Sequence, residues 1–478
     1  MCDWIPGTLE LTSKVRYGIT SKGVPIFRFI PYDKLHRPLA VSCSQRNLFY
    51  NVHAIVQPGP APEKAELQKG ILIQNLGQPT PESEAAVLLA NYAYDCKKEL
   101  RPSKCIKPSK EEGTSLKDLA RRTVLEGFTF NIDPPGCKDV DDSFTIRQVC
   151  QAEAKWEVSI NIADVASLIE EGSELDMQAR RRATSFYSPT GECLAPMFPP
   201  EVVDVASLGS DDPRPALSLQ FIYGPDGLTN FKWLETLVTR SRSFTYDEAD
   251  EAHLLHKYTE LQVIKHITKG VNSHEWVQQM MILYNKKAGE MIKARNAGIL
   301  RSHSAPAAEE LAQLIAIDPS FGILAYEAAT FCLPDSQDGT KHFGLETDAY
   351  AYASSPIRRY CDLVNQRALK GVAIADKEET KDLVYHLNRR QKQAKAFSRD
   401  FFFMTELSNA KDAVDGTVIH CKSKDKGKGK VYVPVWKRTI KVRLLDSPAP
   451  PPGTKVSIEW YDDREKPNWK ERIVFKIR

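Results

Sequence analysis

The sequence predicts an α+β protein of several domains, in which a long mixed α/β region lies between two small β-barrels. The chain has 478 residues, enough for about three domains at roughly 150 residues each. Short alternating runs of apolar residues fill both ends of the chain, whereas long amphipathic helices are confined to the middle. Hydrophobic residues make up 42% and charged residues 27%, which is typical of globular proteins and excludes a wholly disordered chain.

Residues 1–80 are expected to form the first barrel. Strand-like runs cover 8–11, 24–29, 39–44, 49–56 and 70–76, separated by turn-rich pieces, and five short strands in one brief segment favour a barrel of the OB type. Aromatic residues lie close to basic residues here, and the rings are expected either to stack on bases or to fill the barrel core. The next segment, 81–115, is expected to hold a helix to about residue 100, capped by Thr80, and a linker over 101–115.

Residues 116–405 mix strands and helices and are expected to form one large domain. Strands are predicted at 128–132, 144–147, 156–162 and 217–222, and helices at 175–184, 274–294, 357–373 and 378–403. The last segment, 406–478, again predicts a five-stranded barrel, with strands at 416–420, 430–435, 439–445, 455–460 and 472–477.

The last barrel is also basic. Residues 414–478 hold 16 Lys and Arg against 8 Asp and Glu, which leaves 49 against 54 for the rest of the chain. A basic module on a slightly acidic body favours a polyanionic partner, and a solvated basic face is the alternative.

An acidic cluster is the clearest chemical feature. The four carboxylates Asp133, Asp139, Asp141 and Asp142 lie close together around a Pro-Pro-Gly turn at 134–136, which must bring the first back towards the others. Four like charges this close repel, and cations relieve that repulsion. Oxygen ligands without His or Cys indicate Mg²⁺, with Mn²⁺ as a substitute. A calcium loop is disfavoured because its register is absent, while a solvated acidic turn stays open.

The second motif is the run Tyr352-Ala-Ser-Ser-Pro-Ile-Arg-Arg-Tyr-Cys-Asp362. A serine at 354 or 355 is expected to cap a helix with proline in its first turn. Arg358 and Arg359 would then lie at a helix N-terminus, where cations are disfavoured unless an external anion is bound, and a phosphate contact would suit them. A surface salt bridge to Asp362 is the alternative.

Membrane and secretory classes are not expected. No window reaches the roughly 18 uncharged apolar residues of a spanning helix, and the start, MCDWIPG, lacks the apolar core of a signal peptide. Ten scattered cysteines form no C-x-x-C pair, so we expect reduced thiols and an intracellular location, cytoplasmic or nuclear.

Together these motifs resemble the RNB family, which includes ribonuclease II, ribonuclease R and the hydrolytic subunit of the eukaryotic exosome. The acidic signature I-D-P-x-x-x-x-D-x-D-D is matched from Ile132 to Asp142. Further matches follow in order: Ile162-Ala-Asp-Val-Ala166, Thr184-Ser-Phe-Tyr187 with Pro196-Met-Phe-Pro199, Ser243-Phe-Thr-Tyr246, Asn285, Arg301-Ser-His303 and Ser355-Pro-Ile-Arg-Arg-Tyr360. Ser354, Gln366 and Phe198 depart from the usual Thr, His and Leu. The N-terminal segment resembles a cold-shock barrel and leaves room for one barrel, with no endonuclease domain before it.

The resemblance implies a Mg²⁺-dependent 3′-to-5′ exoribonuclease that hydrolyses single-stranded RNA to nucleoside 5′-monophosphates. It implies that the four aspartates hold the metal, with Asp141 most closely tied to the chemistry, and that Arg358 lies on the scissile phosphate. It also implies that Tyr187 and Tyr246 stack on bases, and Arg359 is a further candidate for binding the substrate. A catalytically silent RNA-binding protein of the same fold is one alternative, and a DNA exonuclease or an endonuclease is another.

Overall fold

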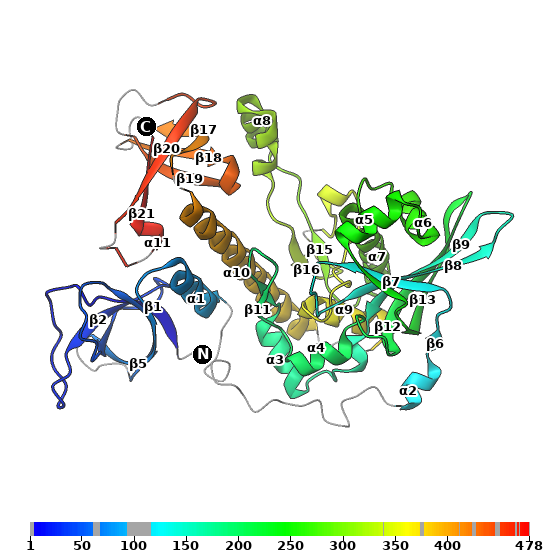
Figure 1. Cartoon of the computed structure of the whole chain (residues 1–478), viewed down its shortest axis with the longest axis horizontal. Coiled ribbons are helices and arrows are strands. Elements are labelled where there is room, and N and C mark those ends of the chain that lie inside the picture. Colours follow the sequence, from blue (N-terminus) through cyan, green and yellow to red (C-terminus); the bar gives the residue numbers. More distant parts are fainter. Residues whose placement is uncertain are drawn as a thin grey trace.

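The computed structural model describes residues 4–60, 67–92, 116–337, 339–372, 377–410, 412–422, 427–444, 450–463, 466–467 and 469–477. The predicted linker over 101–115 and the predicted end of the helix before it lie outside the described residues. Figure 1 shows two barrels on one side, a larger mixed region on the other, and a long helix that runs between them. No helix within the described ranges is long and apolar enough to cross a membrane.

The N-terminal barrel has the strand order of an OB fold. Its closed sheet runs β1-β2-β3-β5-β4, with β3 and β5 parallel and the other pairs antiparallel. The strands are β1 (Ile5–Leu9), β2 (Ile26–Pro31), β3 (Leu39–Ser42), β4 (Val52–Pro58) and β5 (Gln68–Gly77). Alternate residues of β2 are buried, so Phe27 and Phe29 fill the barrel core. The predicted barrel is confirmed, with strand ends shifted by a few positions.

The C-terminal barrel repeats this topology. Its order is β17-β18-β19-β21-β20, with β19 and β21 parallel. The strands are β17 (Val414–Lys422), β18 (Lys428–Val433), β19 (Arg438–Arg443), β20 (Lys455–Asp462) and β21 (Ile473–Ile477), with η4 (Pro434–Trp436) and α11 (Trp469–Arg472) between them. Both barrels therefore have the OB arrangement that five short strands in each segment predict.

The central region is built on a seven-stranded sheet of order β14-β7-β8-β9-β12-β13-β6. The strands are β6 (Thr123–Val124), β7 (Phe128–Asp133), β8 (Asp142–Cys150), β9 (Lys155–Ala163), β12 (Arg214–Gly224), β13 (Gly227–Val238) and β14 (Arg242–Thr245). The edge strands β14 and β6 are parallel to their neighbours, whereas the inner pairs are antiparallel. The long strand β13 is missing from the sequence prediction.

Helices cover this sheet and build the site beside it. They are α2 (Leu116–Arg121), α3 (Glu174–Arg182), α4 (Pro200–Ala206), α5 (Tyr246–Leu254), α6 (Thr259–Thr268), α7 (Ser273–Arg295), α8 (Ala308–Ile317) and α9 (Tyr360–Lys370), with short 3-10 turns η1 (Val165–Ser167), η2 (Pro319–Ala325) and η3 (Phe343–Leu345). Two short hairpins complete the region, β10 (Phe186–Tyr187) with β11 (Cys193–Ala195) and β15 (Leu300–Ser302) with β16 (Thr330–Cys332).

Helix α7 fixes the position of the site relative to the sheet. Every fourth residue from Trp276 to Ile292 is buried, which is the spacing of one helix face. The Tyr284 hydroxyl donates to the carbonyl of Leu217 on β12, 3.1 Å away. On its other side, a side chain at Gly289 would clash with the backbone of Tyr350 at 2.8 Å. The helix therefore holds the 349–355 segment close to the sheet.

Helix α9 begins later than the sequence predicts. Its first residue is Tyr360 and its N-cap is Arg359, so the predicted start at residue 357 with a serine cap is wrong. The reason lies in Asp362, whose carboxylate accepts the backbone N–H of Ser355 at 2.9 Å and the Arg359 guanidinium at 2.7 Å. These bonds hold residues 355–359 in turns ahead of the helix, and the predicted salt bridge to Asp362 is formed, although it is buried rather than on the surface.

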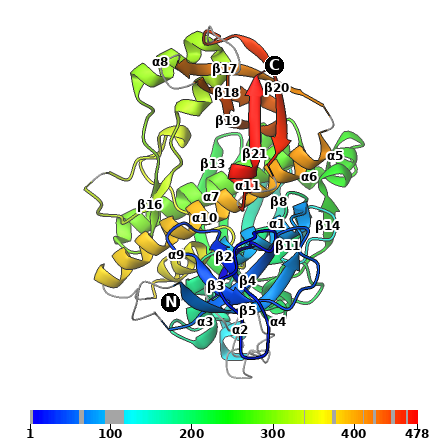
Figure 2. The same cartoon turned by 90° about the vertical axis from the view of Figure 1, so that its left-hand side faces the viewer.

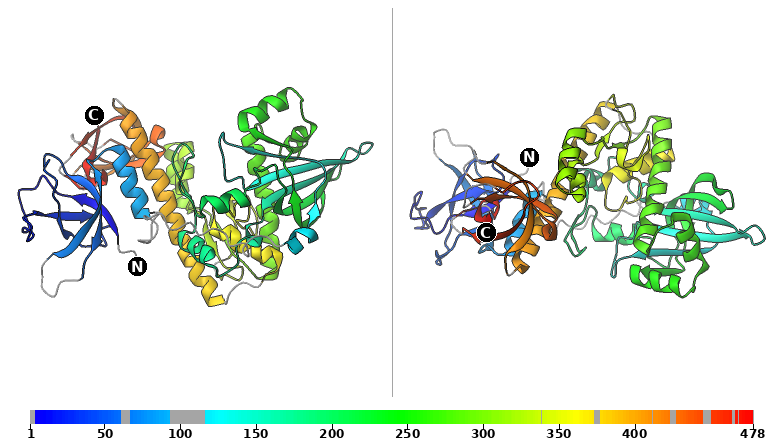
Figure 3. Two further views of the ribbon diagram at one scale, coloured as in Figure 1. Left: turned by 60° about the horizontal axis from the view of Figure 1, so that its bottom comes forward. Right: turned by 90° about the horizontal axis from the view of Figure 1, so that it is seen from above.

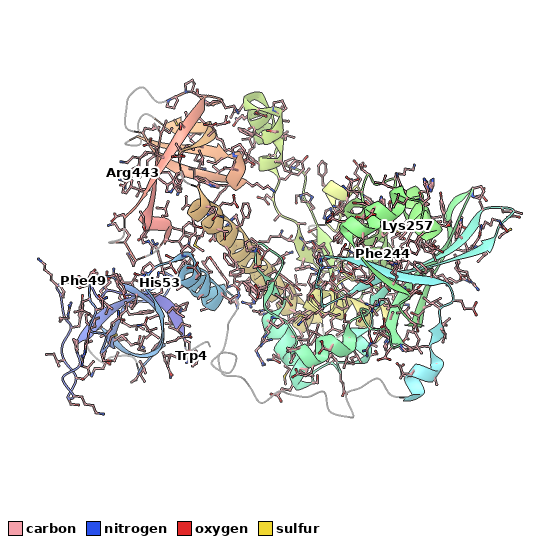
Figure 4. The ribbon with its side chains drawn as sticks, viewed as in Figure 1. Trp4, Phe49, His53, Phe244, Lys257 and Arg443 are labelled. Carbon is pink, nitrogen blue, oxygen red and sulfur yellow. The ribbon has the colours of Figure 1, made fainter. Side chains whose placement is uncertain are left out.

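The two barrels lie against each other and are joined to the central region by α10 (Lys377–Asn409) and α1 (Pro81–Tyr92). Figure 3 shows α10 running from the central region to both barrels, and Figure 2 shows the barrels one above the other. The Thr8 hydroxyl donates to the carbonyl of Pro467, and Arg472 pairs with Glu84 at 2.8 Å. His53 lies between the N-terminal barrel and α1 in Figure 4, with its Nε2 3.4 Å from the same Glu84 carboxylate.

An arm from the central region also reaches the C-terminal barrel. It consists of α8 and η2, which lie between β15 and β16 in the chain and reach β17 and β18 in Figure 1. Phe321 on the arm contacts Tyr432 on β18, with ring centroids 5.2 Å apart, and Leu314 joins the same apolar cluster. The barrel is thus held from two sides, by α10 and by this arm.

Candidate active site

One cleft of about 1260 Å³ collects every site residue predicted from the sequence. Its lining includes Asp133, Asp139, Asp141, Asp142, Tyr187, Tyr246, Arg358 and Arg359. They come from four separate stretches of the chain: the β7–β8 turn, β10, the start of α5, and the turns before α9. The fold therefore brings both sequence motifs, which are far apart along the chain, to the same cleft.

The acidic turn adopts the return path that its sequence predicts. Strand β7 ends at Asp133 and its antiparallel neighbour β8 begins at Asp142, so the two carboxylates lie at the same end of the strand pair. Gly136 in the connecting turn has a φ of +77°, a conformation that L side chains rarely adopt. The Asn131 amide donates to the Asp133 carboxylate at 2.8 Å and orients it at the strand end.

Asp141 and Arg358 form the centre of the site. The Arg358 Nε donates to one oxygen of Asp141 at 2.9 Å, and the backbone N–H of Ile357 donates to the other oxygen at 2.9 Å. The Nη2 of Arg358 also donates to the hydroxyl of Ser355 at 3.1 Å. Asp141 is almost fully buried, whereas 43% of the Arg358 side chain is exposed to solvent. The arginine is therefore aimed by a buried carboxylate while part of it remains open to the cleft.

The two predicted tyrosines lie on opposite elements of the cleft. The Tyr187 hydroxyl donates to Asp139 at 2.6 Å, so this ring is tied to the acidic turn. Tyr246, the first residue of α5, stacks on the His274 ring with centroids 3.6 Å apart and planes 12° apart. Both side chains are half-buried and line the cleft. Their contact with bases stays a prediction.

The electrostatics of the carboxylates reflect burial and crowding. Burial raises the pKa of Asp141 to about 7, against the opposing effect of Arg358. Burial also raises the pKa of Asp142 well above its usual range, and the charges of Asp133 and Asp141 raise it further. The pKa of Asp133 is raised mainly by burial, partly offset by the hydrogen bond from Asn131. The cleft thus lacks enough positive charge to balance its carboxylates.

The donor set fits a hard cation, although the side chains do not already surround one. Within the described ranges, no three His, Cys, Asp or Glu side chains gather closely enough to hold a metal ion. Among the same residues, neither Asp133 nor Asp142 takes part in an ion pair, and Arg359 is already paired with Asp362. Carboxylate oxygens outside any ion pair are the donors that Mg²⁺ and Mn²⁺ prefer, and the thiol of Cys137 beside them donates to Asp139 at 3.7 Å.

Asn285 and Gln366 support the site in ways that the sequence pattern does not reveal. Asn285 on α7 accepts from the N–H of Ala353 at 2.9 Å and donates to the Ser354 hydroxyl at 3.1 Å, which fixes the loop before Arg358. Gln366 is fully buried and bonds both the carbonyl of Ala163 and the N–H of Ala166. The departure at 366 is therefore satisfied by backbone contacts away from the carboxylates.

Tyr352 is a site residue that the sequence motif does not single out. Its ring lies beneath the guanidinium of Arg359, 4.1 Å from the ring centroid, and Arg301 approaches the same ring at 4.3 Å. A tyrosine between two guanidiniums holds both of them in place. The sequence alone offers no signal for this contact, because Arg301 and Tyr352 are joined only through the fold.

Comparison with known proteins gives the family. The RNB domain family matches residues 121–262 and 254–374, which is more than half of the chain. Ribonuclease R of Buchnera aphidicola is 24% identical over 351 residues, covering 57% of this chain and 48% of the relative. The exosome complex exonuclease RRP44 of Homo sapiens is 24% identical over 477 residues, covering 79% of this chain and 49% of the relative. This chain belongs to the RNB family, and it spans about half the length of these curated relatives.

Solved structures share the whole fold. RNase R of Mycoplasma genitalium matches 100% of this chain and 90% of its own, with a TM-score of 0.75 and 14% identity. Yeast Ssd1, described as a pseudonuclease, matches 92% of this chain and 65% of its own, with a TM-score of 0.70 and 17% identity. The RNase R-like arrangement of an RNB region with OB barrels, expected from the resemblance, is confirmed.

Proposed function

We propose that this chain is a 3′-to-5′ exoribonuclease that hydrolyses single-stranded RNA to nucleoside 5′-monophosphates with the help of Mg²⁺ or Mn²⁺. The observation that carries the proposal is the assembly of all four aspartates and Arg358 in one cleft, with Arg358 bonded to Asp141. The family and its ribonuclease members support the same reaction.

Asp133, Asp139, Asp141 and Asp142 are the residues that would hold the metal. When bound there, Mg²⁺ would supply the positive charge that activates water and stabilises the leaving 3′-oxygen. The carboxylates' own part is to bind the cation and to orient the residues around them: Asp141 fixes Arg358, and Asp139 fixes the Tyr187 hydroxyl. Both bonds position side chains that line the cleft.

Arg358 would bind the scissile phosphate. Its Nε and Nη2 are used by Asp141 and Ser355, while its Nη1 makes no hydrogen bond to the described residues. A guanidinium fixed in this way meets a phosphate oxygen without losing further side-chain freedom, and it offsets charge that develops in the transition state. Tyr187, Tyr246 and Arg359 would hold the last nucleotides of the strand by stacking and charge.

The C-terminal barrel would hold the strand farther from its 3′ end. A pocket of about 820 Å³ on this barrel is lined by the basic residues Lys428, Lys430, Lys441, Arg443, Lys466 and Lys470. Arg443 lies on the outer part of the barrel in Figure 4. Positive charge gathered on one barrel face suits the phosphates of single-stranded RNA.

A catalytically silent RNA-binding protein is the second candidate. The fold match to yeast Ssd1 favours it, because the same architecture occurs in a protein described as a pseudonuclease. The intact aspartates and Arg358 of this chain favour hydrolysis instead.

Incubation of linear and circular forms of one unstructured RNA with Mg²⁺ tests the proposal. We expect nucleoside 5′-monophosphates from the linear RNA and no cleavage of the circle. Cleavage of the circle would establish an endonuclease, and binding of both RNAs without hydrolysis would establish the silent alternative.

A further inference from the structure

Three aromatic side chains form a shelf that we call the mouth platform: His303, which lines the cleft, and its neighbours Tyr326 and Phe343. The ring centroids of His303 and Tyr326 are 5.9 Å apart, and those of Tyr326 and Phe343 are 6.2 Å apart, with planes 37° apart in each case. Tyr326 and Phe343 are each 40% exposed. Two neighbouring large rings left open to solvent indicate a surface that binds something flat and apolar.

Hydrogen bonds hold the inner ring of the platform, His303, and the backbone beside it. His303 uses both ring nitrogens: Nε2 donates to the carbonyl of Glu327 at 3.0 Å, and Nδ1 accepts from the N–H of Gly344 at 3.2 Å. The backbone N–H of Phe343 donates to the carbonyl of His303 at 2.9 Å. A Cβ at Gly344 would lie 3.0 Å from the His303 ring, so glycine permits this close approach. A preorganised surface of this kind loses little entropy when a ligand stacks on it.

A series of ring contacts connects the platform to the catalytic residues. His303 contacts His342 at 5.0 Å, His342 contacts Tyr350 at 5.2 Å, and Tyr350 contacts Tyr352 at 6.1 Å. Tyr352 in turn lies beneath Arg359. Of these, His303, His342, Tyr350 and Tyr352 line the same cleft as the four aspartates. The inner rings fill the wall, whereas the platform rings stand open at the end of the series.

The chain beyond the platform leads to the basic barrel. Tyr326 follows directly after η2, the part of the arm whose Phe321 packs on Tyr432 of β18. Strand β18 also carries Lys428 and Lys430, which line the basic pocket. Through Tyr326, the platform is therefore joined to the arm that reaches the barrel proposed to hold phosphates.

We propose that His303, Tyr326 and Phe343 form a base-stacking subsite for single-stranded RNA, which holds a nucleobase upstream of the 3′-terminal nucleotide. This inference rests on the proposed function for the direction of the strand. Stacking accepts any base, because every base has a π face, and it would keep the strand aligned as it moves towards the carboxylates. The exposed rings would otherwise be a docking surface for another protein, which the test below separates from RNA binding.

Abasic scanning of the RNA tests the subsite. A short 5′-fluorescein-labelled oligo(A) carries one abasic position, moved stepwise from the 3′ end, and binding to the full chain is measured in EDTA. In the unaltered protein we expect one upstream position whose abasic form binds about fivefold or more weakly, as expected for the loss of one stacked base. The double variant Tyr326→Ala with Phe343→Ala is expected to bind intact RNA more weakly by a similar factor. The abasic position should then have no further effect on binding.

Two control variants complete the experiment. Tyr385→Ala removes a ring on α10 that is 75% exposed and does not line the cleft, and this variant is expected to leave binding unchanged. Tyr326→Phe keeps the stacking face and is expected to bind like the unaltered protein. An abasic effect that persists in the double alanine variant, or unchanged binding of intact RNA by that variant, would overturn the subsite and favour a protein-docking surface.

The subsite and the proposed function fail in distinguishable ways. Hydrolysis of the same RNA in Mg²⁺ is followed in parallel. If hydrolysis occurs but the abasic effect persists in the double alanine variant, the subsite is wrong and the function stands. If the abasic effect disappears in that variant but no protein form hydrolyses RNA, the subsite stands and the chain is an RNA-binding protein.

Discussion

Asp164 supports the fold of the RNB region rather than its chemistry, and replacing it tests that distinction. It lies in the Ile162-Ala-Asp-Val-Ala166 match and is fully buried. Its carboxylate pairs with Arg122 at 2.6 Å and Lys370 at 2.8 Å, and it caps η1 by accepting the N–H of Ser167. These contacts join α2, η1 and α9, and Asp164 does not line the cleft.

The size of the effect of Asp164→Asn follows from the partners that remain. Removing one member of a buried pair costs about 3–5 kcal/mol when the other charge is left alone. Here Arg122 keeps Asp118 at 2.9 Å and Lys370 keeps Glu235 at 3.1 Å, both of them more exposed carboxylates. The amide also preserves the shape of the side chain. We therefore expect a loss of roughly 2–3 kcal/mol in unfolding free energy, at or below the lower end of that range.

Native-state hydrogen exchange measures this loss. The strands to follow are β9 and β12, because Asp164 directly follows β9 and its N–H donates to the carbonyl of Pro215 on β12. Exchange in these strands is read separately from exchange in the barrels. Asp118→Asn is the matched control, because it removes a more exposed partner of the same arginine and should cost under about 1 kcal/mol. RNA hydrolysis by Asp164→Asn at low temperature should persist. Unchanged exchange together with lost hydrolysis would refute the structural role and place Asp164 in the chemistry.

Three further predictions concern the site, the basic barrel and the contact between barrels. Arg358→Lys keeps a positive charge but loses the anchoring by both Asp141 and Ser355. The rate constant of single-turnover hydrolysis should therefore fall about 10²- to 10³-fold, while RNA binding in EDTA changes little. An unchanged rate constant would contradict this. Lys430→Gln with Lys441→Gln, a cross-strand pair in the basic pocket, should reduce the slope of log affinity against log salt by about 1.4, and an equal slope would argue against phosphate contacts there. Burial lowers the pKa of His53 to about 4, so its contribution to stability is lost as the pH falls from 6.5 to 4. Burial raises the pKa of Glu84 to about 7, so its contribution to stability is lost as the pH rises from 4.5 to 7. Stability measured by urea unfolding should therefore fall with acidification in Glu84→Gln, where His53 remains. It should rise with acidification in His53→Gln, where Glu84 remains. Identical pH profiles of the two variants would contradict the assignment.

Local sequence patterns predicted the parts of the fold that local forces determine. The barrel strands follow from short alternating apolar runs, and the acidic turn follows from Pro-Pro-Gly between two strands. Thr80 caps α1 as expected, with its hydroxyl accepting the N–H of Ser83 at 3.3 Å. In each case the residues that decide the structure are close together in the sequence.

The missed features depend on distant contacts or lack a periodic signal. Strand β13 lies at the outer part of the sheet and buries few side chains, so its sequence shows no clean alternation. The turns before α9 are held by Asp362, and they are also tied through Ile357 and Arg358 to Asp141, which lies far earlier in the chain. The mouth platform likewise joins rings from three separate parts of the chain: the residue after β15, the residue after η2, and η3. Only the fold shows that these residues meet.

A labelled-RNA assay tests the central claim most directly. A 5′-labelled single-stranded RNA with Mg²⁺ is compared with the identical DNA strand and with the Asp141→Asn variant, which keeps the shape of the buried side chain. We expect progressive shortening of the labelled RNA from its 3′ end, lost in the variant and absent on DNA. Binding of the RNA by the unaltered protein without any shortening would contradict the account and assign the chain to the silent RNA-binding class.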